Sequence, residues 1–254
     1  MKIGLIDVDG HNYPNLALMK ISAYHKAQGD TVEWCFPFYH YDIVYQSKVF
    51  DDTYSPDISW EPWADKIIKG GTGYGLDNRL SDEVEHMYPD YSLYPEYTKD
   101  TAYGFLTRGC CNDCSFCIVS KKEGRCSKKV ADLSEWWNGQ KKIKLLDPNI
   151  LACKDHMDLL QQLVDSKAKV DFTQGLDARF VNEENLALLK QIDIQMIHFA
   201  FDFMKFEKQI VKGLSLAKEV LHIDFRKAVV YMLTNYDTTI QEDLYRVEKI
   251  RELG

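Results

Sequence analysis

The sequence lacks a membrane span, an export signal and an excess of positive charge. Within its 254 residues, no run approaches the roughly 18 apolar residues of a membrane span. The first residues, Met1–Asp7, read as a strand rather than as the apolar core of a signal peptide. The net charge is −8, so a broadly basic footprint for nucleic acid is absent. We therefore expect a cytoplasmic protein without membrane contact, and nucleic acid is not indicated as a partner.

The cysteines do not form the pattern of a disulfide-bonded protein. There are seven of them, an odd number, and four lie within residues 110–117. In a chain without an export signal, this clustering indicates metal binding or redox chemistry in a reducing compartment. A basic group at residues 121–129 follows the cysteines, and we interpret it as a solvated loop.

Strand and helix patterns alternate along most of the chain. Residues 1–85 predict a small doubly wound parallel sheet of the flavodoxin or Rossmann type. Residues 86–100 are rich in tyrosine and proline without a clear period, and we predict a domain linker there. Residues 101–254 predict five β–α units, which form a partial (β/α) barrel. The predicted strands are 103–107, 143–146, 170–173, 196–201 and 228–233, and a capping box at Thr239 and Glu242 opens the last predicted helix. Chemistry in such folds gathers at the carboxyl ends of the strands.

Three cysteines follow the first predicted strand of this second domain. Their spacing is Cys110-x3-Cys114-x2-Cys117, with an aromatic residue, Phe116, before the last. Three thiolates from one loop can hold three corners of a [4Fe–4S] cluster, which leaves the fourth iron open to a small molecule. The spacing and the position resemble those of the radical S-adenosylmethionine (SAM) superfamily. An alternative register begins at Cys111; we prefer Cys110, because Cys111 then falls where the family tolerates many residues.

A zinc site is the competing interpretation of the same cysteines. Tetrahedral zinc prefers four sulfur or nitrogen ligands, often as two close pairs. Cys114 and Cys117 with Cys153 and His156 would supply such a set. That set leaves Cys110 and its position at a strand end unexplained. The second hypothesis for the function is accordingly a non-catalytic iron–sulfur or zinc-binding protein with a degenerate barrel.

The resemblance implies a radical SAM enzyme. In this superfamily the open iron binds SAM, one electron cleaves the sulfonium reductively, and the resulting radical acts on a substrate. The sequence does not identify the substrate, and both modification and methyl transfer occur in the superfamily. The resemblance also implies an electron donor similar to flavodoxin or ferredoxin. The family barrel commonly has six β–α units, and this chain shows five, so we expect a barrel open on one side.

Contacts to SAM usually come from the later strand ends in this family. Asp147 stands where the family often has Gly-Gly-Glu, and we expect it to receive the methionyl ammonium. Arg179 is expected to pair with the carboxylate of SAM, because a guanidinium fork matches that group. Asp202 is expected at the ribose hydroxyls, and Asn235 at the adenine or the ribose. The complete set of expected SAM-binding residues is Phe116, Asp147, Gln174, Arg179, Asp202 and Asn235.

The first domain resembles the cobalamin-binding-like domain that precedes many radical SAM barrels. The segment 9–14 is close to the Asp-x-His-x-x-Gly pattern whose histidine coordinates cobalt, but Pro14 replaces the glycine. Residues 47–49 and the pair Gly70-Gly71 lie where such domains contact the nucleotide tail. Many members keep this fold without holding cobalamin. We therefore expect a substrate-shaping or vestigial domain, and His11 as a turn residue rather than a ligand.

A third hypothesis for the function starts from the same segment. Asp7-x-Asp9-Gly10 after a first strand resembles the haloacid-dehalogenase phosphatases. In that family the first aspartate is the nucleophile and the second is an acid/base. The other elements expected of that family are not evident in the sequence.

Overall fold

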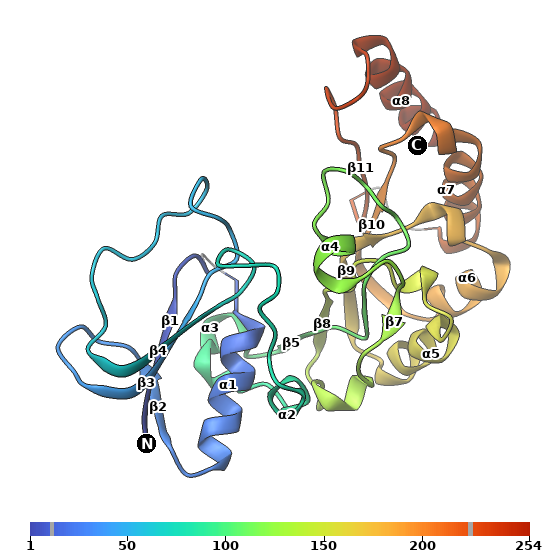
Figure 1. The fold of residues 1–254 in the computed structure, drawn as a ribbon. Helices are drawn as coiled ribbons and strands as arrows, with labels where there is room; N and C mark the ends of the chain where they lie inside the picture. Colours follow the sequence, from blue (N-terminus) through green and yellow to red (C-terminus); the bar gives the residue numbers. More distant parts are fainter. Residues whose placement is uncertain (11–12, 223–225) are drawn as a thin grey trace. The chain divides into compact units, whose positions relative to one another are not determined.

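The computed structural model describes residues 1–10, 13–222 and 226–254 of the chain. It divides into two compact units, Met1–Asp100 and Thr101–Gly254 (Figure 1). The segment 86–100, for which we predicted a linker, lies within the first unit. There Asp90 accepts hydrogen bonds from Ser22 and Lys26 of the first long helix. No helix in the described ranges is long and apolar enough to cross a membrane.

The first unit is built on a four-stranded parallel sheet in the order β2-β1-β3-β4. Helix α1 begins after Asn15, whose side chain accepts a hydrogen bond from the Leu18 N–H and caps the helix. Buried apolar residues of β1 and α1 form the core of this unit. Its elements are β1 (Lys2–Asp7), α1 (Leu16–Ala27), β2 (Thr31–Trp34), β3 (Tyr41–Ser47), β4 (Ala64–Gly70), α2 (Asp82–Glu85), the 3₁₀ turn η1 (Tyr91–Leu93) and α3 (Pro95–Thr98).

The second unit contains a five-stranded parallel sheet in the order β11-β10-β9-β8-β5. Strands β5 and β11 stand at opposite ends of this order, so the sheet does not close into a barrel. Figure 1 shows α5, α6, α7 and α8 following one another along one side of the sheet. The predicted α/β class and the partial barrel of five β–α units are therefore confirmed.

The strands of this sheet are β5 (Thr101–Gly104), β8 (Lys142–Leu145), β9 (Lys169–Leu176), β10 (Asp193–Ala200) and β11 (Ala228–Tyr231). The short strands β6 (Thr107–Arg108) and β7 (Lys128–Lys129) form a separate antiparallel pair. The helices are α4 (Val119–Glu123), α5 (His156–Ser166), α6 (Glu183–Leu189), α7 (Glu207–Leu221) and α8 (Ile240–Leu253). The 3₁₀ turns are η2 (Leu133–Glu135), η3 (Ile150–Ala152), η4 (Ala178–Phe180) and η5 (Met204–Phe206).

Two strand ends differ from the sequence prediction, and both differences affect the site. We predicted one strand over 103–107, but β5 ends at Gly104 because the N–H groups of Leu106 and Thr107 donate to the carboxylate of Asp147 instead of to a strand. Strand β9 runs on to Leu176 rather than ending at Thr173. The extra residues include Gly175, whose φ of 101° favours glycine.

Candidate active site

The cysteine loop, residues 109–118, lies between β6 and α4. Gly109 has a φ of 85°, and a Cβ there would lie 2.3 Å from the carbonyl oxygen of Cys126. The Cys110 N–H donates to the carbonyl of Gly124 at 3.2 Å, and Glu123 accepts a 2.7 Å bond from Arg108. The end of α4 therefore holds the start of the loop, and only glycine fits at residue 109.

Asp147 anchors the chain just before this loop. Its carboxylate accepts from the Leu106 N–H at 2.8 Å, the Thr107 N–H at 2.7 Å and the Thr107 hydroxyl at 2.6 Å. Burial raises the pKa of Asp147 to about 7, against the opposing effect of these hydrogen bonds. Asp147, which we expected at the methionyl ammonium, therefore has its carboxylate occupied by the chain itself.

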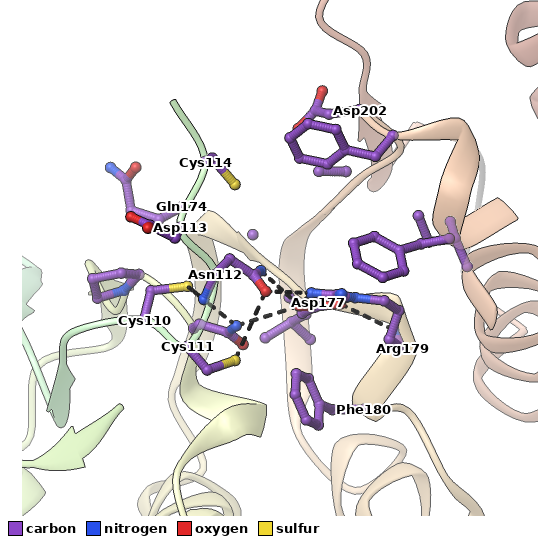
Figure 2. A pocket seen from close by; sticks show the side chains of 18 of the residues that line it. Cys110, Cys111, Asn112, Asp113, Cys114, Gln174, Asp177, Arg179, Phe180 and Asp202 are labelled. Carbon is purple, nitrogen blue, oxygen red and sulfur yellow. Dashed lines mark hydrogen bonds and ion pairs between the residues drawn. The ribbon is translucent and has the colours of Figure 1, made fainter. Parts of the chain in front are cut away.

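A cavity of about 510 Å³ opens beside the cysteine loop, at the carboxyl ends of β9 and β10. Among its lining residues are Cys110, Cys114, Gln174, Arg179 and Asp202 (Figure 2). The structure thus brings these five predicted residues together around one space. Cys117, Phe116, Asp147 and Asn235 are not among the described residues that line it.

A hydrogen-bonded triangle ties the cysteine loop to the end of β9. Arg179 donates to both carboxylate oxygens of Asp177, from Nε at 2.9 Å and from Nη2 at 2.6 Å. Asn112 accepts from Arg179 and donates to Asp177 at 3.0 Å (Figure 2). Burial raises the pKa of Asp177, but hydrogen bonds from Arg179 and Asn112 outweigh it and hold that pKa below its usual range. The guanidinium that we expected at the SAM carboxylate thus fixes the cysteine loop.

Close helix packing holds this triangle in place. Gly213 in α7 lies so near η4 that a Cβ there would be 1.8 Å from the carbonyl oxygen of Ala178. The Arg179 guanidinium also lies 4.2 Å from the ring centroid of Phe206, in a cation–π contact. The helix after β10 therefore supports the residues at the end of β9.

The sulfur of Cys110 receives two hydrogen bonds. The donors are the Asn112 N–H at 3.4 Å and the side-chain nitrogen of Asn149 at 3.5 Å. Cys111, by contrast, is exposed, and its sulfur lies 3.8 Å from the side-chain oxygen of Asn112 as a weak donor. This difference favours the register that begins at Cys110.

An aromatic contact joins the cysteine loop to the loops after β10 and β11. Phe116 stacks on Phe203 with ring centroids 5.9 Å apart, and meets Tyr236 edge-on at 5.4 Å. The Tyr236 hydroxyl and Ser115 are hydrogen-bonded at 3.0 Å. The predicted Asn235, beside this contact, has a φ of 56° and donates its N–H to the carboxylate of Asp243. Phe116 thus packs beside the cavity rather than lining it.

The donor set fits an iron–sulfur cluster better than a single zinc ion. All seven cysteines are outside disulfides. In the described part of the chain, no three His, Cys, Asp or Glu side chains converge where one metal ion would bind. A zinc ion needs such convergence, whereas each cysteine of a [4Fe–4S] cluster ligates its own iron. Three thiols of one loop, of which those of Cys110 and Cys114 line the cavity, suit the cluster.

Comparison with known proteins decides the fold. No protein-family model matches the chain, and no curated protein matches it. Among solved structures it is similar to the radical S-adenosylmethionine methyltransferase TsrM from Kitasatospora setae, with cobalamin and a [4Fe–4S] cluster bound. The TM-score is 0.69 at 11% identity, over 99% of this chain and 73% of that one. The chain has the radical SAM fold. The predicted cobalamin-binding-like first unit before a partial radical SAM barrel is thereby confirmed.

The residues of the first unit that we expected at a cobalamin nucleotide tail are used within the unit itself. Lys48 is fully buried, and its ammonium pairs with Asp52. Gly71 has a φ of 91°, and a Cβ there would lie 2.3 Å from the carbonyl oxygen of Lys48. Gly71 thus serves close backbone packing, whereas a Cβ at Gly70 would meet no described atom within 4 Å. The carbonyl of Gly70 accepts a 3.1 Å hydrogen bond from the Lys48 N–H. The expected turn residue His11 lies outside the described residues.

The carboxyl edge of the same sheet is also occupied. The strand order changes direction between β1 and β3, where ligands of open α/β sheets commonly bind. At this point Tyr94 donates to Asp7 at 2.6 Å, and Asn15 donates to Ser47 at 2.8 Å. Side chains of this unit therefore occupy the point where the strand order changes direction. Asp9 in turn accepts from the N–H groups of residues 49 and 50, so neither aspartate of the phosphatase-like segment stands open.

Proposed function

We propose that the chain is a radical SAM enzyme. It uses a [4Fe–4S] cluster, held by Cys110, Cys114 and Cys117, to cleave SAM reductively and to start radical chemistry on a substrate. The observation that carries the proposal is the cysteine loop at the edge of a cavity formed by strand carboxyl ends, in a chain with the radical SAM fold.

The cluster, when bound, supplies the electron that cleaves the sulfonium of SAM. The three thiolates hold it, and the triangle of Asn112, Asp177 and Arg179 keeps their loop in place. Preorganisation of this kind keeps reacting groups in position and excludes competing paths.

Polar side chains of the cavity are the proposed SAM contacts. Gln174 and Asp202 line it, and Asp202 is oriented by a 2.8 Å hydrogen bond from the Leu233 N–H. Lys205 lines it as well, with its ammonium 4.8 Å from the Phe206 ring centroid. Because the Arg179 guanidinium is already paired with Asp177, Lys205 is the cation we assign to the carboxylate of SAM. A protein similar to flavodoxin or ferredoxin is the proposed electron donor.

Anaerobic reconstitution with iron and sulfide tests the proposal. The expected product is a brown protein with about four iron and four sulfide per chain. With SAM and a reductant it releases 5′-deoxyadenosine and methionine. The Cys114→Ala variant is expected to lose both the cluster and this release.

Cys111→Ala is the matched control, because Cys111 is the neighbouring cysteine of the same loop. We expect it to keep the iron content and the release of deoxyadenosine. A colourless protein with one zinc ion, or a Cys114→Ala variant with an unchanged cluster, contradicts the proposed function.

A further inference from the structure

Asn149 is a buried amide whose environment is not explained by folding alone. It follows β8, and its residue surface is 2% exposed. Its side-chain nitrogen lies 3.5 Å from both the Cys110 sulfur and the Asp177 carboxylate. Its side-chain oxygen has no hydrogen-bond partner in the described structure. A buried acceptor without a partner destabilises the folded chain, so an apolar residue here would avoid a cost that Asn149 incurs.

The nitrogen of Asn149 therefore points to a role at the sulfur. The Cys110 sulfur receives this bond and a second one from the Asn112 N–H. Within the described ranges, the sulfurs of Cys114 and Cys117 receive no hydrogen bond. Of the three proposed cluster ligands, Cys110 is thus the one whose sulfur receives hydrogen bonds in the described structure.

Asn149 is also held in place for this purpose. Asp177 accepts the second bond of the same nitrogen, and the Arg179 guanidinium neutralises the charge of Asp177. The carboxylate therefore orients the amide without adding an unpaired negative charge beside the thiol.

We propose that Asn149 is a positioning residue that donates an N–H to the Cys110 thiolate and raises the reduction potential of the cluster. This inference rests on the proposed function. Reduction adds one electron from the external donor, and negative charge on the sulfurs increases while no bond to Asn149 breaks. An N–H donor stabilises the more negative, reduced state more than the oxidised one. Hydrogen bonds to the sulfurs are among the determinants of cluster potentials, and outer-shell partners tune their metal sites.

The test is a redox titration, followed by electron paramagnetic resonance (EPR), of the reconstituted full chain without SAM. Asn149→Leu removes the donor at similar size, and we expect the midpoint potential to shift to a more negative value. Asn149→Asp places an acceptor at the same position, and we expect a larger shift in the same direction. Gln174→Leu is the matched control, because it removes an exposed amide of the same cavity that is not bonded to a cysteine. Its potential is expected to equal that of the wild type.

A second measurement uses the wild-type protein and therefore still tests the inference if the variants fail to bind the cluster. Wild-type protein labelled with ¹⁵N only in asparagine side chains is expected to show a ¹⁵N coupling to the reduced cluster in pulsed EPR. An unchanged potential in a cluster-containing Asn149→Leu protein overturns this inference, as does absence of the coupling. In both cases a wild type that binds four iron and cleaves SAM leaves the proposed function intact. A wild type that binds no cluster overturns both.

Discussion

The ion pair of Asp177 and Arg179 allows a quantitative test of how the cysteine loop is held. Its two short bonds join side chains that are 11% and 18% exposed. Removing one partner of a buried pair costs about 3–5 kcal/mol, because the other charge is left uncompensated. Asp177 keeps weaker donors from Asn112 and Asn149, so we place Arg179→Met near the lower end, at about 3 kcal/mol of unfolding free energy.

A double-mutant cycle isolates the pair itself. Replacing both residues, as Asp177→Leu with Arg179→Met, removes the buried charges together and is expected to cost less than the sum of the single variants. The expected coupling energy is about 2 kcal/mol, within the range for residues in one network. The assay is urea unfolding of the cluster-free protein at pH 7 with a reductant present. The exposed pair Lys249 and Glu252, at 2.8 Å, is the matched control, with an expected coupling of about 0.5 kcal/mol or less.

The pH dependence of the coupling provides a further check. The pKa of Asp177 is held below its usual range in the folded chain. Its contribution to stability is therefore present above the unfolded pKa of about 4 and is lost as the pH falls through the folded value. If the changes in unfolding free energy of the two single variants add at pH 7 to within about 0.5 kcal/mol of the double variant, the role of this pair in holding the loop is refuted.

Three further outcomes follow from other contacts. Gly213→Ala places a Cβ against the Ala178 carbonyl and is expected to lower the unfolding free energy by about 1–3 kcal/mol in urea titrations; an unchanged midpoint contradicts this packing. The pKa of Asp147 is raised to about 7 in the folded chain. Its contribution to the unfolding free energy is therefore lost as the pH rises from about 4 to 7. In the Asp147→Asn variant, the unfolding free energy is expected to lose this part of its pH dependence. A variant with the same pH dependence as the wild type contradicts this expectation. Desalting is expected to remove hydroxocobalamin from the wild-type protein, because Tyr94, hydrogen-bonded to Asp7, fills the sheet edge. Cobalt that stays with the protein after desalting contradicts this expectation.

Local sequence patterns were sufficient to predict most of the elements. The capping box predicted at Thr239 and Glu242 is present at the start of α8, because such a cap involves residues three positions apart. The five strands of the second unit were predicted from short apolar runs. The end of β5 was not predictable in this way, since Asp147, 41 residues beyond Leu106, determines where pairing stops.

The candidate site shows the same difference between features set by local sequence and features set by long-range contacts. The sequence by itself determined the three cysteines and their place after a strand, because one loop carries the whole spacing. It also pointed to Gln174, Arg179 and Asp202, since parallel strands bring their carboxyl ends to one edge. Asn112 and Asp177 gave no sequence signal, because their roles depend on contacts across 65 residues of chain.

Only the tertiary structure decided what the polar residues around the cysteines do. Asp147 and Arg179 stand at positions where the sequence predicted ligand-binding residues. In the structure, Asp147 accepts a hydrogen bond from Thr107, and Arg179 forms an ion pair with Asp177. Asn149, without a sequence signal, contacts a cysteine sulfur instead. The physical reason is that a charged or polar side chain is defined by its partners, and partners from different strands meet only once the sheet has formed.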